Sequence, residues 1–211
     1  LGALMATGDT KLSICSDALI MLGASPLSSF SEGSDAAQIC DRLYNDIKST
    51  LTVMYPWGFS QKKVQLARLS DAPASEWEHA YALPADNIGS GVVALFTSSA
   101  AGSRPVADGW EIYERNVLTN FTEVHVDYQA NVSEGVMPSY FVQLLKYWMA
   151  WHIAETVTDQ ITKAQYYQLQ ACGNPSENMR GGMFRVCCQI DGGAKPPQTI
   201  EDFDLISTRL S

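Results

Sequence analysis

Apolar residues recur every three or four positions near both ends of the chain, whereas the middle of the chain alternates between apolar and polar residues. The first stripe predicts a helix over residues 11–22, with an apolar side formed by Cys15, Ala18, Leu19 and Leu22. Asp9 or Thr10 can accept hydrogen bonds from its first turn, and Gly23 is a typical residue just past a helix end.

The second stripe is the most regular in the sequence. It predicts a helix that begins after Ser34, a favourable capping residue, and ends before Pro56. Its apolar positions are Ala36, Cys40, Leu43, Ile47, Leu51 and Met54. Beyond Pro56, Trp57 and Phe59 are expected to cover the core, and residues 61–69 fit either a short helix or a strand.

Residues 77–128 contain strand-like runs, namely HAYAL, GVVALFT, GWEIYERNVLT and EVHVDYQA. In the last run, Val124, Val126 and Tyr128 alternate with polar residues, which is typical of a strand with one solvated face. Short polar breaks separate the runs, so the pattern predicts an antiparallel meander.

A helical pattern returns after Pro138, a residue that favours the start of a helix. Its broad apolar side consists of Phe141, Leu144, Leu145, Trp148, Met149, His152 and Val157. A polar hinge at 158–162 and a shorter helix over 163–172 follow, and Gly173 ends that helix. The rest of the chain is rich in glycine and proline and closes with TIEDFDLISTRL, which fits a short helix or a docking arm.

This order of elements predicts an α+β fold, in which a helical bundle carries an inserted antiparallel β subdomain and an extended C-terminal arm. With 211 residues and 46% hydrophobic content, the chain is long enough to bury such a core. The expected parts are an N-terminal arm (1–10), the first part of the bundle (11–69), the β subdomain (70–137), the second part of the bundle (138–172) and a C-terminal docking arm (173–211).

Charge narrows the range of partners. The chain has a net charge of −9, and its 14 basic residues do not form a cluster. Because tight nucleic-acid binding depends on clustered lysine and arginine, we expect no such binding; an acidic surface instead suits DNA that must slide past without sticking.

The sequence also has no apolar run of the ~20 residues that span a bilayer, so no membrane partner is expected. Its start does not resemble a signal peptide, and Met5 is a candidate translation start, with Leu1 to Leu4 upstream of it.

The sequence offers little catalytic chemistry. Its cysteines lack the spacing of a disulfide framework or a zinc site, so we expect reduced thiols and no metal. His79 and His125 lie on predicted strands and could face solvent, whereas His152 lies within the apolar side of the long helix, where we expect a structural role. The common nucleotide-binding and hydrolase motifs do not occur, so the sequence predicts no cofactor and no catalytic residue.

Glycoside hydrolysis is the enzyme class that these residues leave open, because it needs only a pair of carboxylates. Acidic residues flank Trp77 and Trp110, which could stack on sugar rings. The candidates are Glu76, Glu78, Asp86, Glu111 and Glu114. We favour the alternative interpretation, in which they are solvated positions at strand edges, where charge also prevents unwanted strand pairing.

The aromatic content has a further interpretation. The chain has five tryptophans, more than one small core needs, and subunit interfaces are enriched in such residues. The candidates for a subunit interface are therefore Trp148, Trp151, Trp57 and Phe59.

Four segments, in order, resemble the tail tubular protein A family, the head-to-tail adaptors of short-tailed bacteriophages. They are residues 16–67, with LGASPL after the first helix and a PWGF end after the second; 77–88, with WEHAYALPADNI; 109–132, with GWEIYERNVLT; and 137–158, with the MPSYF helix. The likeness covers roughly residues 12–160 and becomes loose beyond Gly173. One departure is Glu114-Arg115, where the family often has a glycine.

The resemblance implies a structural protein of the virion neck, assembled in the host cytoplasm, without obligatory catalysis. Members of the family form a ring, usually twelvefold, beneath the portal protein. The ring extends the DNA channel and supports the tail nozzle, or tail tubular protein B, and the genome passes through without sequence-specific binding. Apolar residues of the C-terminal arm are then candidates for portal docking: Ile200, Phe203, Leu205, Ile206 and Leu210.

Two alternatives to this adaptor remain open. One is a polysaccharide depolymerase at the tail, and the other is a stopper or neck connector of a long-tailed phage, because the order of helices does not separate the two kinds of connector.

Overall fold

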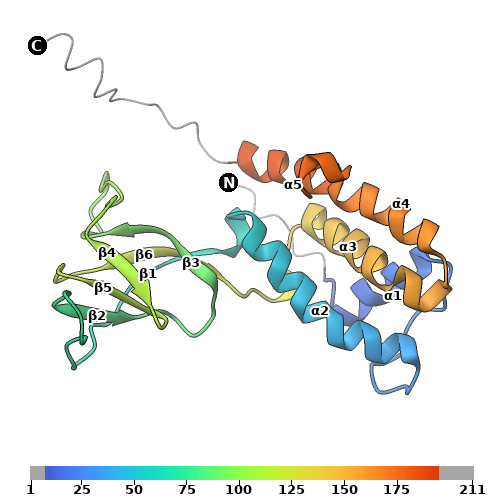
Figure 1. The fold of residues 1–211 in the computed structure, drawn as a ribbon, viewed down its shortest axis with the longest axis horizontal. Helices are drawn as coiled ribbons and strands as arrows, with labels where there is room; N and C mark the ends of the chain where they lie inside the picture. The colour runs from blue at the N-terminus through green and yellow to red at the C-terminus, as the bar shows by residue number, and fades with distance from the viewer. Residues whose placement is uncertain (1–7, 195–211) are drawn as a thin grey trace, which may run out of the picture.

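The computed structural model describes residues 8–194 and has an α+β fold, as the sequence predicts. A helical bundle and a β subdomain lie side by side as two lobes, and the C-terminal end of α2 points at the β lobe (Figure 1). The helices are α1 (Lys11–Met21), α2 (Asp35–Met54), α3 (Ser139–Thr158), α4 (Ile161–Cys172) and α5 (Gly182–Gly193). Short 3-10 turns occupy Gly58–Ser60, Glu134–Val136 and Pro175–Glu177.

The helix ends follow from local sequence. Thr10 accepts a hydrogen bond from the Ser13 backbone N–H (3.1 Å), and Ser13 accepts one from the Thr10 backbone N–H (2.9 Å), which satisfies both donors at the start of α1. Ser34 caps α2 in the expected way, by accepting a hydrogen bond from the Ala37 N–H at 3.2 Å. Asp159, in the left-handed conformation with φ of 53°, ends α3.

Helix α3 is the centre of the bundle, because it contacts each of the other four helices. Its large apolar residues are therefore buried on several sides, including Phe141, Leu144, Leu145, Trp148, Met149 and Ile153. Burial on more than one side explains why the apolar positions of α3 form a broad side, whereas α2 has a narrow stripe.

The β lobe contains two three-stranded antiparallel sheets. One has the order β1 (Gln61–Gln65), β6 (His125–Ala130), β3 (Asn87–Phe96), and the other has the order β2 (His79–Ala82), β5 (Asn116–Thr119), β4 (Trp110–Tyr113). The two sheets share one apolar core, which includes Leu66, Tyr81, Leu95, Val117, Val124, Val126 and Tyr128. Only β4 and β5 are neighbours both in sequence and in a sheet, so the predicted meander is wrong.

The structure changes two of the expected boundaries. Residues 61–65 form a strand that pairs with β6, so the β lobe begins at Gln61 rather than at residue 70. The chain after Gly173 is not an extended arm throughout, because residues 182–193 form α5, which packs on α3 and α4. The remainder of the expected docking arm, residues 195–211, lies outside the described residues.

The two lobes meet at the C-terminal end of α2. The Gln129 side chain of β6 donates to the backbone carbonyls of Thr52 (2.8 Å) and Tyr55 (2.6 Å). Gly89 has a positive φ of 64°, and a Cβ there would lie 2.9 Å from the Val53 side chain, so this close approach requires glycine. The β lobe is thus hydrogen-bonded and packed directly onto α2.

Candidate interaction surfaces

Trp57 forms the aromatic centre of the bundle. It has no exposed surface, and its indole N–H donates to the Leu51 carbonyl at 2.8 Å. Its ring contacts Phe141 edge-on, with ring centroids 5.1 Å apart, and Phe59 lies 4.8 Å from Phe141. Trp57 cannot contact another subunit, so its assignment to a subunit interface is wrong, and its expected role in covering the core is confirmed. Phe59 is half-buried in the same cluster.

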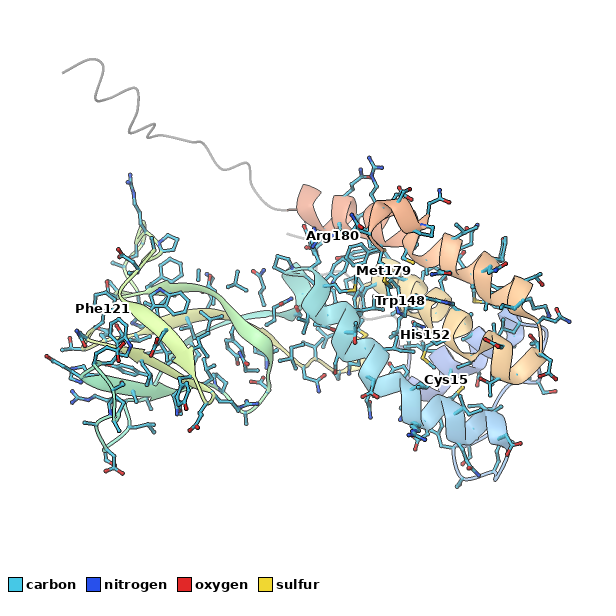
Figure 2. All side chains as sticks on the ribbon, viewed as in Figure 1. Cys15, Phe121, Trp148, His152, Met179 and Arg180 are labelled. Carbon is cyan, nitrogen blue, oxygen red and sulfur yellow. The ribbon has the colours of Figure 1, made fainter. Side chains whose placement is uncertain are left out.

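Trp148 is also a core residue, since only 2% of its surface is exposed, and its assignment to an interface is wrong for the same reason. Trp151 is half-buried beside it, at 5.4 Å between ring centroids, and His152 is exposed and packs on Trp151 at 4.3 Å. Trp148 and His152 both lie on α3 (Figure 2). The His152 Nδ1 lies 2.8 Å from the Trp148 carbonyl oxygen, which can only accept, so Nδ1 carries the proton and donates it. This satisfied nitrogen fits the expected structural role, and Trp151 remains an interface candidate.

The outer sides of α4 and α5 expose a set of apolar side chains that the sequence reasoning missed. We define the outer strip as Tyr166, Leu169, Met179, Val186 and Ile190, which are between 39% and 56% exposed. The two helices follow one another along the same side of the bundle (Figure 1), and Met179 lies in the loop that joins them (Figure 2). Val186 and Ile190 are four positions apart, which is the spacing of one side of a helix. The glycines on both sides of them are poor helix formers, so the sequence alone did not indicate a helix here.

A buried carboxylate holds α5 on the bundle. Asp191 is 5% exposed, and its two oxygens accept from the Gly58 N–H at 3.1 and 3.0 Å. Its Oδ1 also accepts from the Tyr140 hydroxyl at 2.8 Å. Burial and the neighbouring Asp191 raise the pKa of Tyr140, so this hydroxyl remains a donor at neutral pH. The C-terminal turn of α5 is therefore tied both to α3 and to the turn that follows α2.

The cysteines are free thiols, and four of the five are buried. Cys15 on α1 and Cys40 on α2 face each other in the bundle core, where the hydrogen bond to Cys40 and burial raise the pKa of the Cys15 thiol. Within residues 8–194, no cluster of three or more histidine, cysteine or acidic side chains could hold a metal ion. These thiols therefore behave as small apolar residues of the core.

The carboxylates considered for glycoside hydrolysis are spread over the β lobe. Glu76 and Glu78 precede β2, Glu111 is exposed on β4 and Glu114 is exposed in the β4–β5 turn. Asp86 accepts from the Lys62 ammonium at 2.5 Å and from the Tyr128 hydroxyl at 3.0 Å. Lys62 lowers the pKa of Asp86, the opposite of what a general acid requires.

The tryptophans and histidines of the β lobe are buried or half-buried in their own subunit. The Trp110 indole donates to the Val106 carbonyl at 3.2 Å, and Trp77 is half-buried. His79 is buried rather than facing solvent, because its strand lies in the second sheet with its side chain covered. His125 is partly exposed and lies 2.8 Å from the Glu123 carboxylate.

A hollow of about 340 Å³ lies on the first sheet, beside the loop at residues 98–103. Its lining includes Lys63, Phe96, His125 and Asp127 and none of the five carboxylates considered for hydrolysis. Lys63 forms an ion pair with Asp127 and lies 5.6 Å from the centre of the Phe96 ring. The charged side chains of this hollow thus already have partners within the subunit, since His125 lies against Glu123 as Lys63 does against Asp127.

The lysines of the described chain are all engaged within the subunit. Five of the six lysines between residues 8 and 194 form ion pairs with carboxylates: Lys11 with Asp41, Lys48 with Glu134, Lys62 with Asp86, Lys63 with Asp127 and Lys146 with Asp17. The sixth, Lys163, donates to the Leu22 carbonyl at 2.7 Å. A phosphate backbone would have to compete with these partners for each ammonium group.

Among the helices between residues 8 and 194, none has the length and apolar character that a membrane span requires.

Comparisons with known proteins give little further information. No protein-family model matches the sequence, and a comparison with curated proteins finds no match. Among solved structures, the chain is similar to a chain in the structure described as "Neck of empty GTA particle computed with C6 symmetry", with 16% sequence identity and a TM-score of 0.28, over 74% of this chain and 82% of that chain. At this TM-score the likeness supports no argument about fold or function.

Proposed function

We propose that the protein is a structural virion protein, a head-to-tail connector of which many copies form a ring around the path of the genome DNA. The class of protein comes from the resemblance of four ordered segments to the tail tubular protein A family, which also implies a twelvefold ring between the portal and the tail nozzle. The proposed location is the neck of the virion, with assembly in the host cytoplasm and no membrane partner.

The observation that carries this proposal is the way the charges are arranged. The chain has a net charge of −9, and the lysines between residues 8 and 194 are already bonded to groups of the same subunit. A ring built from such subunits carries a net negative charge, and each of these lysines would have to exchange a partner before it could bind phosphate, so we expect DNA to move through the ring without being held.

The two-lobed shape agrees with a connector that has different neighbours at its two ends. The helical bundle and the β lobe have separate apolar cores, and the contacts of Gln129 and Gly89 hold them together. Each lobe can therefore contact a different ring of the neck while the subunit keeps its shape.

The first experiment is electron imaging of the purified protein together with analytical ultracentrifugation. We expect particles with a central hole and a mass that is a multiple of the subunit mass. A protein that stays monomeric at high concentration, both alone and with a portal ring, would contradict the proposal.

A second experiment tests the charge argument with double-stranded DNA at low salt. The wild-type ring should retain little DNA, whereas the double variant Asp86→Asn with Asp127→Asn, which frees Lys62 and Lys63, should retain more. The control variant Asp35→Asn changes an exposed carboxylate that forms no ion pair in the described part of the chain. Strong retention by the wild-type ring would exclude a passive channel.

The same proposal includes the absence of an enzymatic role. Its test is polysaccharide cleavage by the wild-type protein and by amide variants at Glu76, Glu78, Asp86, Glu111 and Glu114. If the wild type cleaves a polysaccharide and one of these variants does not, the purely structural role is wrong.

A further inference from the structure

The outer strip of α4 and α5 combines exposed apolar side chains with positive charge. Arg180 follows Met179 and Arg185 precedes Val186 in the sequence; both arginines are exposed, and neither forms an ion pair with the described residues (Figure 2 shows Arg180). The acidic residues nearby are used locally: Glu177 accepts from the Asn174 N–H at 2.8 Å, and Asp191 is buried. In a chain with a net charge of −9, this surface is suited to an acidic partner with apolar side chains.

The chain itself contains a segment with that chemistry. Residues 199–210, TIEDFDLISTRL, have apolar residues at 200, 203, 206 and 210, spaced three, three and four positions apart. This is the spacing of one side of a helix, and Thr199 followed three positions later by Asp202 fits a helix start. Its three acidic residues, Glu201, Asp202 and Asp204, outnumber its one basic residue, Arg209, and so complement the arginines beside the outer strip.

The composition of the residues between α5 and this segment favours the strip of a neighbouring copy. The segment is joined to Ala194 by Lys195, Pro196, Pro197 and Gln198. A proline pair favours an extended chain of about 3.1 Å per residue, so a linker of this composition can reach about 15 Å. Binding to the strip of the same copy would instead require the chain to reverse direction within those four residues.

We propose that residues 199–210 of one copy bind the outer strip of a neighbouring copy. This inference rests on the proposed ring and assigns the segment a partner other than the portal, which the resemblance implied. Each copy then offers its segment to one neighbour and its strip to the other, and this head-to-tail type of contact is the kind that closes a ring.

The test uses two full-length variants that each add one cysteine to the five native ones, Val186→Cys on the strip and Ile206→Cys on the segment. The two proteins are mixed under assembly conditions, oxidised and analysed by non-reducing gel and by mass spectrometry of the linked peptides. A disulfide between these two positions in the mixture can form only between copies, and each variant alone gives the background from the native thiols. In the matched control, the Ile206→Cys protein is mixed with a Gln38→Cys protein instead of the Val186→Cys protein. Gln38 is an exposed residue of α2, away from the strip.

We expect linked peptides from the Val186→Cys mixture and not from the Gln38→Cys mixture. Reversing the charge of the strip with Arg180→Glu and Arg185→Glu should lower the yield about fivefold at low salt. Combining this change with Glu201→Arg and Asp202→Arg should restore the yield, which a purely structural defect would not allow.

Two results would overturn the inference while leaving the ring in place. One is imaging that shows rings without any link between the two positions. The other is a link that appears only within single chains of the double variant Val186→Cys with Ile206→Cys. A monomeric wild-type protein would instead overturn the proposed connector, and with it this inference.

Discussion

The contacts of Asp191 give the most direct test of how α5 is held. Replacing Asp191 by alanine removes the acceptor of the Gly58 N–H and of the Tyr140 hydroxyl, which lie 3.0 and 2.8 Å from the carboxylate. A buried donor left without a partner costs about 1–3 kcal/mol, and Tyr140 is half-buried and can turn partly toward water. We therefore expect Asp191→Ala to lower the free energy of unfolding by about 2–4 kcal/mol.

Asp191→Asn separates the loss of an acceptor from the loss of the side chain. The amide oxygen can still accept from Tyr140, but the amide nitrogen would then face the Gly58 N–H, and two donors would meet. The expected loss is about 1 kcal/mol, less than for alanine. Gln189→Ala, at an exposed position of α5, is the matched control and should change stability by less than about 0.5 kcal/mol.

The measurement is urea denaturation followed by tryptophan fluorescence, because Trp57 is the residue before Gly58 and reports on this site. Hydrogen exchange adds a local readout, with faster exchange expected across Gly182–Gly193 in the alanine variant. If Asp191→Ala were as stable as Gln189→Ala and α5 kept its protection, the carboxylate would not be what fixes α5, and the reasoning would be refuted.

Three further predictions concern the loops and the contact between the lobes. Glu114 and Arg115 both have positive φ, at 47° and 62°, in a two-residue hairpin turn, so Glu114→Gly should raise the free energy of unfolding by about 0.5–1 kcal/mol; an unchanged or lower value would contradict this view of the turn. Hydrogen bonds from Ser34 and Ser28 lower the pKa of Glu32 to about 2 from its ordinary 4.5, so the loop gains stability above pH 4.5 and loses it as the pH falls toward 2; carboxyl NMR should give this midpoint, and Glu32→Gln should abolish the pH dependence. Gln129→Leu leaves two carbonyls at the end of α2 without their donor and should cost about 2 kcal/mol in urea denaturation, whereas Gln129→Glu, which also removes the donor, should be no more stable than Gln129→Leu.

Much of the bundle could be predicted because its helices are defined by local patterns. The stripe of α2, its Ser34 cap and its end before Pro56 all depend on residues close in sequence. Helix α5 was missed because Gly181, Gly182, Gly192 and Gly193 weaken its helical pattern, and its stability depends on Asp191 meeting a turn far away in sequence. Local propensity carries no information about that contact.

The β lobe and the interface candidates also depend on contacts between residues far apart in sequence, which local patterns do not reveal. Alternation located most strand regions, but GWEIYERNVLT, expected as one run, is the hairpin of β4 and β5. Residues 61–65 stayed open between helix and strand, because their pairing with 125–129 is non-local and no turn signal links them. The number of tryptophans indicated that large apolar areas must be covered, but not whether the cover comes from the same subunit. Trp57 and Trp148 are covered by their own subunit, whereas the outer strip is exposed.

The hydrogen bonds of Gln129 to the end of α2 have a mechanical consequence. The β lobe contacts the end of α2 directly, through the two hydrogen bonds of Gln129 and the packing of Gly89 on Val53. A tensile load on the β lobe therefore passes into the backbone of α2 through these contacts. The subunit should therefore respond to force as a stiff body, so that a displacement of one lobe reaches the other lobe nearly undiminished.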